Sequence, residues 1–189
     1  SGKEIDALGR AGFPISVAVN VSAANLDHLD FPDRIEEACL RLCGSCEKLT
    51  VELTESAQQS VTYLLDTMTR LRIKGASLSL DDFGTGYSSL VQLHQLPFSE
   101  MKVDRSFVVG MTTSLECRTI VKSIIDLARN LGLSVVAEGV ETAETIDMLR
   151  SLGCDAAQGY YIAKPMPDTA LMAWLRSEER RVGKEWRSR

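Results

Sequence analysis

The sequence lacks any uninterrupted apolar run near the roughly 20 residues that a bilayer-spanning helix needs. It also lacks the basic and then apolar start of a secretory signal. The 189 residues carry 21 basic and 26 acidic side chains, so no positive excess is available for a nonspecific grip on nucleic acid. We therefore predict a soluble cytoplasmic α/β domain without membrane contact and without a DNA or RNA polymer as partner.

Cysteine is scarce, and its pattern does not suggest disulfides. Five cysteines in a chain without a secretion signal fit a reducing compartment. Cys39, Cys43 and Cys46 lie close together, but a structural zinc site takes four ligands and no nearby His or Cys supplies the fourth. We interpret these cysteines as small buried side chains at the end of a helix that Gly44 terminates.

Both ends of the chain differ from its middle. Ile5 and Leu8 follow a helical spacing, which predicts the last turns of a helix that begins before Ser1. Residues 176–189 combine dense charge with no apolar period and resemble a translated sequencing adaptor. We predict that they are a non-native tail, with a natural basic extension as the alternative, and that one domain spans residues 1–175.

Between these ends, short β-rich runs alternate with amphipathic helical patterns, which predicts parallel βα units. The expected strands span residues 15–21, 49–53, 76–81, 100–103, 133–138 and 156–162. Apolar side chains at helical spacing predict helices over 61–71 and 121–131. Thr142 is expected to cap a further helix that Gly153 ends.

Each expected strand is apolar until its C-terminal end, where a polar side chain stands. These side chains are Asn20, Glu52, Asp81 with Asp82, Lys102, Glu138 and Gln158. The strand ends of a (β/α)₈ barrel meet on one rim, whereas a doubly wound sheet gathers polar residues near its switch point. We therefore predict an incomplete TIM-like (β/α)₈ barrel with about six of its eight strands, since such barrels usually need about 250 residues.

Carboxylates on one rim repel one another unless cations lie between them. Oxygen ligands without His or Cys favour Mg²⁺ or Mn²⁺. The adjacent Asp81 and Asp82 suit a pair of ions, with Asn20 and Lys102 at the edge of the site and Lys102 beside an attacking water. A helix cap or a simple ion pair is the alternative at any single position. The strand ends taken together favour phosphodiester hydrolysis.

The run from Asp81 to Leu90, DDFGTGYSSL, resembles the EAL domain family. Other family motifs occur in the family's order: VNVS at 19–22, ELTES at 52–56, KVDRSF at 102–107, AEGVET at 137–142 and QGY at 158–160. The resemblance covers residues 1–175. It implies a barrel that hydrolyses cyclic di-GMP to linear pGpG with two Mg²⁺ or Mn²⁺ ions.

The resemblance also implies residue roles. The metal ligands that it implies are Asn20, Glu52, Asp81, Asp82 and Glu138, with Asp81 as the bridge between the ions. Lys102 corresponds to the lysine beside the nucleophilic water, so the catalytic set is Lys102 with the four carboxylates. Gln158 corresponds to a supporting residue. Glu55 corresponds to the glutamate that steadies the loop after Asp82, a loop linked in the family to metal binding and to homodimers.

Two features depart from the family pattern. Ala24-Asn25 stands where Arg-Gln is frequent, and the Glu-Ala-Leu signature, whose glutamate is a metal ligand, is absent from the 189 residues and expected before Ser1. The resemblance implies a parent enzyme that cleaves cyclic di-GMP. The sequence leaves open whether a GGDEF, sensory or membrane segment lies upstream. The alternatives are a silent EAL domain acting as a receptor or interaction module, and a barrel for another phosphodiester. The 189 residues alone are expected to be inactive.

Overall fold

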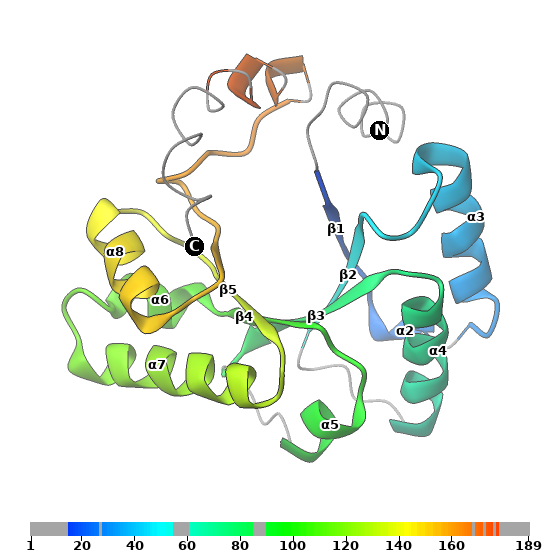
Figure 1. Ribbon diagram of the computed structural model, residues 1–189, viewed down its shortest axis with the longest axis horizontal. Coiled ribbons are helices and arrows are strands. Elements are labelled where there is room, and N and C mark those ends of the chain that lie inside the picture. The colour runs from blue at the N-terminus through cyan, green and yellow to red at the C-terminus, as the bar shows by residue number, and fades with distance from the viewer. Residues whose placement is uncertain are drawn as a thin grey trace.

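The computed structural model describes residues 15–26, 28–54, 61–84, 90–167, 169–171, 173–175 and 177. Strands and helices alternate along this part of the chain (Figure 1). The strands are β1 (Val17–Asn20), β2 (Leu49–Thr54), β3 (Ser77–Phe83), β4 (Glu100–Val103), β5 (Ser134–Ala137) and β6 (Ala156–Ala157). The helices are α2 (Ala23–Leu26), α3 (Phe31–Cys43), α4 (Val61–Ile73), α5 (Leu90–Gln95), α6 (Arg105–Gly110), α7 (Leu115–Asn130) and α8 (Ala143–Leu152).

All six described strands are parallel and form one sheet in the order β1-β2-β3-β4-β5-β6. Each strand therefore pairs with the next one along the chain. A doubly wound sheet would reverse this order at a switch point, whereas a barrel keeps it. Figure 1 shows the strands following an arc with the helices on its outer side. The predicted α/β barrel class is confirmed, with six strands forming part of the barrel wall.

The apolar core lies between the outer face of the sheet and the buried faces of α4 and α7. The strand residues in this core are Val51, Leu53, Leu78, Leu80, Phe83, Met101, Val103, Val135 and Ala137. Successive side chains of a strand point to opposite faces. The residues between these positions, among them Glu52, Ser79, Asp81 and Lys102, therefore face the inner side of the arc.

The predicted helical patterns are confirmed as parts of α4 and α7, although α4 continues to Ile73 and α7 begins earlier, at Leu115. The cap and the end predicted for the helix after Thr142 are also confirmed. Met68 of α4 and Val121 of α7 are fully buried, as the helical spacing predicts. The Thr142 hydroxyl accepts a hydrogen bond from the Thr145 N–H at 3.1 Å, and Gly153 ends α8 with a φ of 79°. No helix in the described part of the chain is long and apolar enough to cross a membrane.

Two of the three cysteines near Gly44 are buried, as interpreted from the sequence. Gly44 ends α3 in the left-handed conformation, with a φ of 80°. Cys39 and Cys46 are buried in the apolar cluster beneath α4. The side chain of Cys43 lies outside the described residues.

The strand predicted over residues 156–162 is wrong beyond Ala157. Gly159 approaches the loop after β5 so closely that a Cβ atom there would lie 2.2 Å from the backbone N and O of Val140. The N–H groups of Tyr161 and Ile162 then donate to the carbonyls of Val140 and Gly159, at 3.0 Å each. The chain therefore turns onto its neighbour instead of extending.

Candidate active site

Lys102 lies at the centre of the polar strand ends. Its ammonium donates to Glu52 Oε1 at 3.0 Å, Asp81 Oδ1 at 3.2 Å and Glu138 Oε1 at 2.5 Å. The Lys102 side chain on β4 is only 5% exposed, and its partners come from β2, from β3 and from the residue after β5. The predicted convergence is confirmed for these residues. The prediction that Lys102 lies at the edge is wrong, because its long side chain reaches inward across the sheet.

The surroundings of Lys102 decide its charge. Burial acts to lower its pKa, but the hydrogen bonds to Glu138 and Glu52 outweigh burial and raise the pKa above its usual value. An ammonium has three N–H donors, and each meets one of the three carboxylates. Lys102 therefore stays protonated at neutral pH with its donors satisfied.

A β-bulge in β3 brings the side chains of two adjacent aspartates into the same cluster. The pairing of β3 with β4 shifts between Leu80 and Phe83, and Asp82 has a φ of 56°. The Asp82 N–H donates to Asp81 Oδ1 at 3.0 Å. Neighbouring residues of a regular strand would point to opposite faces, whereas a bulge re-aims a side chain. Carboxylate oxygens of Asp81, Asp82 and Glu138 consequently lie within 4.8 Å of one another.

The crowding of these carboxylates changes their proton affinity. Burial and the neighbouring charges of Asp81 and Asp104 raise the pKa of Asp82. Burial also raises the pKa of Glu138, although the hydrogen bond from Lys102 opposes this. One ammonium cannot neutralise four carboxylates, so a bound cation could balance the remaining negative charge. The ligand atoms that this site offers are carboxylate oxygens, which fit Mg²⁺ or Mn²⁺.

Asp104 is a site residue that the sequence reasoning missed. Its carboxylate accepts from the Ser106 N–H at 2.9 Å as the N-cap of α6 and shares a hydrogen bond with Asp82. Burial acts to raise its pKa, but the hydrogen bonds from Ser106 and the backbone lower it below its usual value. Its position two residues after Lys102 in the KVDRSF run was the available signal.

The other predicted site residues are Asn20, Gln158 and Glu55. Asn20 is level with Glu52 in the strand register, and its side chain is exposed. Gln158 follows β6, and its backbone bonds to Ala137 and Val140. Within the described ranges, no hydrogen bond joins the Asn20 or Gln158 side chains to the cluster. Glu55 and the loop at 85–89, to which the dimer prediction refers, lie outside the described residues.

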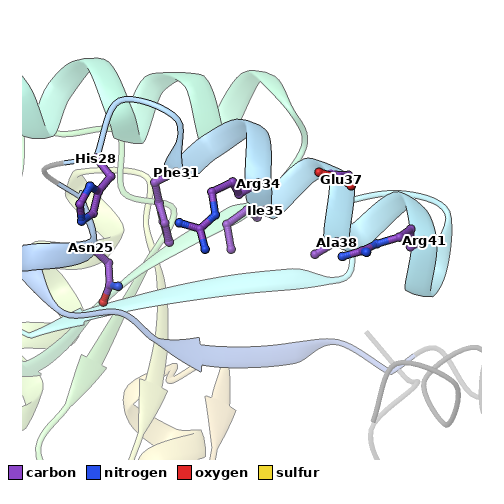
Figure 2. Close-up of a pocket in the computed structure, with 8 residues that line it drawn as sticks. All are labelled: Asn25, His28, Phe31, Arg34, Ile35, Glu37, Ala38 and Arg41. Carbon is purple, nitrogen blue, oxygen red and sulfur yellow. The ribbon is translucent and has the colours of Figure 1, made fainter.

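A separate cavity of about 350 Å³ lies against α2 and α3 (Figure 2). Its lining includes Asn25, one of the two residues that depart from the family pattern. The other lining residues are His28, Phe31, Arg34, Ile35, Glu37, Ala38 and Arg41. None of the clustered carboxylates lines it, so this cavity is distinct from the site at the strand ends.

A sequence model of the EAL domain family matches residues 3–165, which include all the strand ends described above. The chain is a member of the EAL domain family. Among curated relatives of this EAL domain is the cyclic di-GMP phosphodiesterase NbdA of Pseudomonas aeruginosa, 41% identical over 164 residues. Another is the bifunctional diguanylate cyclase/cyclic di-GMP phosphodiesterase MucR of the same organism, 40% identical over 159 residues.

The EAL domain described here corresponds to part of each relative. The matches cover 86% and 84% of this chain but only 21% of NbdA and 23% of MucR. Among solved structures, the MucR phosphodiesterase in complex with cyclic di-GMP shares 37% identity with a TM-score of 0.84, over 90% of this chain and 70% of that one. Klebsiella pneumoniae BlrP1 with manganese and cyclic di-GMP shares 28% identity with a TM-score of 0.79, over 88% and 43%.

Proposed function

We propose that the chain carries most of the catalytic barrel of a phosphodiesterase that hydrolyses cyclic di-GMP to linear pGpG. The observation that carries this proposal is the buried Lys102 surrounded by Glu52, Asp81 and Glu138 in a member of the EAL domain family. Structures of the relatives MucR and BlrP1 contain cyclic di-GMP, which supports this substrate. The cytoplasm, where the five cysteines stay reduced, is the proposed location.

Two divalent cations, Mg²⁺ or Mn²⁺, are the proposed cofactors. The oxygen donors of Asp81, Asp82 and Glu138 lie close enough to share ions, and the manganese in the BlrP1 structure supports this choice. Glu52 and Asn20 would complete the ligand set, with Asp81 between the ions. When bound, such ions lower the pKa of a water and stabilise charge on phosphoryl oxygens.

The chain's own residues have distinct proposed roles. Lys102 holds its ammonium beside the carboxylates. If cations took over one of these carboxylates, an N–H of Lys102 would become free to donate to the attacking water or to a phosphoryl oxygen. Preorganised donors of this kind stabilise the charge that develops in a transition state. Gln158 would support the site from the turn after β6, and Glu55 would steady the loop after Asp82.

The proposed partners extend beyond the substrate. The relatives are several times longer than the matched region, and MucR is named as a bifunctional diguanylate cyclase and phosphodiesterase. A GGDEF or sensory domain in the parent protein is therefore proposed as the regulatory part. A homodimer through the loop after Asp82 is proposed from the family resemblance.

The decisive experiment follows pGpG release from cyclic di-GMP by chromatography at saturating Mn²⁺. It compares the 189-residue chain with a chimera in which the preceding part of the MucR EAL domain, including a Glu-Ala-Leu signature, is fused before residue 15. We expect turnover by the chimera and none by the chain alone, because the added strands close the barrel and complete the ligand set.

Variants of the chimera test the residue roles. Asp81→Asn and Glu52→Gln should each abolish turnover, because each removes charge from the metal site with little change of shape. Lys102→Ala should slow hydrolysis more than it weakens nucleotide binding. A chimera that binds cyclic di-GMP without cleaving it would instead support the receptor function, and an Asp81→Asn variant as fast as its parent would refute the mechanism.

A further inference from the structure

Ser79 on β3 is a fully buried polar residue that the proposed mechanism does not use. Its relative exposure is 0%, and within the described part of the chain its Oγ atom has no hydrogen-bond partner. A buried hydroxyl without a partner is destabilising, and buried waters usually satisfy such groups. Ser79 therefore requires a partner that protein atoms do not supply.

The strand order places Ser79 on the strand between those that carry Glu52 and Lys102. Lys102 is on β4 and Glu52 on β2, so their contact of 3.0 Å spans the inner face of β3 between them. Ser79 lies on that face, two residues before Asp81, and is the direct register partner of Glu52. Ser79 is therefore the residue of β3 that lies level with Glu52 on the face where Lys102 and Glu52 meet.

The donors and acceptors around Ser79 indicate which group accepts its hydrogen bond. The three N–H donors of Lys102 are directed at three carboxylates, and an ammonium cannot accept a hydrogen bond. Asp81 is two positions along the same strand, roughly 6.6 Å away at the backbone. Ser79 has a glutamate as register partner on each neighbouring strand, Glu52 on β2 and Glu100 on β4. Glu52 is buried, whereas Glu100 is partly exposed to solvent, so Glu52 is the carboxylate that needs an internal donor. Lys102 contacts Glu52 Oε1, and Oε2 is the atom assigned to Ser79.

We propose that Ser79 is a positioning residue whose hydroxyl, through one buried water, holds the Glu52 carboxylate in the orientation that the divalent-cation site needs. This inference rests on the proposed function.

Two matched variants of the 189-residue chain test the proposal: Ser79→Ala, and Ser77→Ala on the same face of the same strand. Mn²⁺ binding is measured by the electron paramagnetic resonance of the free ion, and thermal unfolding is measured in EDTA. Residues that orient a metal ligand typically change affinity by about 10–100-fold. We expect Ser79→Ala to raise the Kd for Mn²⁺ at least tenfold with an unchanged or higher Tm, and Ser77→Ala to leave the Kd unchanged.

A high-resolution crystal structure of the metal-free chain supplies an independent measurement. A water within hydrogen-bond distance of both Ser79 Oγ and Glu52 is expected. Its absence would overturn the proposal, and so would an unchanged Kd for Ser79→Ala, a loss of both affinity and Tm, or no Mn²⁺ binding by the unsubstituted chain. If Ser79→Ala weakens Mn²⁺ binding as expected while the chimera releases no pGpG, only the proposed function fails.

Discussion

At the scale of single residues, Lys102 and the carboxylates around it dominate the site. One buried ammonium contacts Glu52, Asp81 and Glu138, while Asp82 and Asp104 lie beside them. Buried charges are tolerated in proteins only when they are paired or bind ions. A divalent cation bound here would act on the same carboxylates as Lys102, so we expect the stability of the chain to depend on metal.

Replacing Lys102 by Met tests this dependence. The Lys102→Met variant leaves three carboxylates without their ammonium, and breaking a buried ion pair typically costs about 3–5 kcal/mol. We expect a large fall of Tm in EDTA and a smaller fall in Mn²⁺, because the ion substitutes for the lost charge. Thermal unfolding in EDTA and in Mn²⁺ measures the two changes of Tm.

The matched control is Lys122→Met, which removes an exposed pair with Asp126 on α7. Exposed pairs contribute about 0–1 kcal/mol, so its Tm should hardly change in either buffer. Equal losses for Lys102→Met in EDTA and in Mn²⁺ would show that the carboxylates do not hold the ion.

Asp82 predicts a pH dependence of the metal-free chain. Its pKa is raised above 3.8 in the folded state by burial and by the charges of Asp81 and Asp104. A raised carboxyl pKa favours folding below the unfolded value, and this contribution is lost as the pH rises through the folded value. Asp82→Asn stays neutral and also tolerates the left-handed backbone at this position.

Asp82→Asn should therefore raise the Tm in EDTA at neutral pH, and most of this gain should disappear below about pH 3.8. Thermal unfolding across pH 3 to 8 is the measurement. Asp66→Asn, at an exposed position of α4, is the control. A Tm of Asp82→Asn equal to or below that of the unsubstituted chain at pH 7 would contradict the prediction.

At the scale of elements, the ends of helices and strands place the site. α8 follows the loop that carries Glu138, and Thr142 caps it by accepting from the Thr145 N–H. Gly159 brings the turn after β6 against Val140 in the same loop. The loop that carries Glu138 is thus held by two neighbouring elements as well as by β5.

The cap of α8 gives a local test. Thr142→Ala removes the acceptor of the Thr145 N–H and should cost about 1 kcal/mol, the usual value for an N-cap. Urea unfolding measures this loss. Thr142→Ser retains the hydroxyl and should recover most of the stability, so a serine variant as unstable as alanine would show that the methyl group matters rather than the cap.

At the scale of the whole molecule, the family match ends at residue 165, before the charged C-terminal segment. We expect deletion of residues 178–189 to leave the Tm within about 2 °C, since a loss of 1 kcal/mol would shift it by about 2–4 °C in a chain of this size. Differential scanning calorimetry of the two chains is the measurement. A fall of several degrees would show that the tail stabilises the fold.

Much of the fold follows from local patterns. The strand predicted over 100–103 agrees with β4 at both ends, and the helical spacing of 61–71 and 121–131 corresponds to α4 and α7. The polar strand ends predicted one shared rim because parallel strands carry their carboxyl ends to the same side. The motif around Asp81 and Asp82 indicated the family on its own.

The sequence by itself determined the class of fold, the family and most of the carboxylates, because side-chain periodicity and motifs are local properties of a chain. Only the tertiary structure decided that Lys102 lies at the centre, that a bulge turns Asp82 inward, and that Asp104 and Ser79 adjoin the site. These features depend on the register between strands that are distant in sequence. The sequence spacing gives the position of a side chain on its strand. It does not give how far a side chain such as that of Lys102 extends across the neighbouring β3.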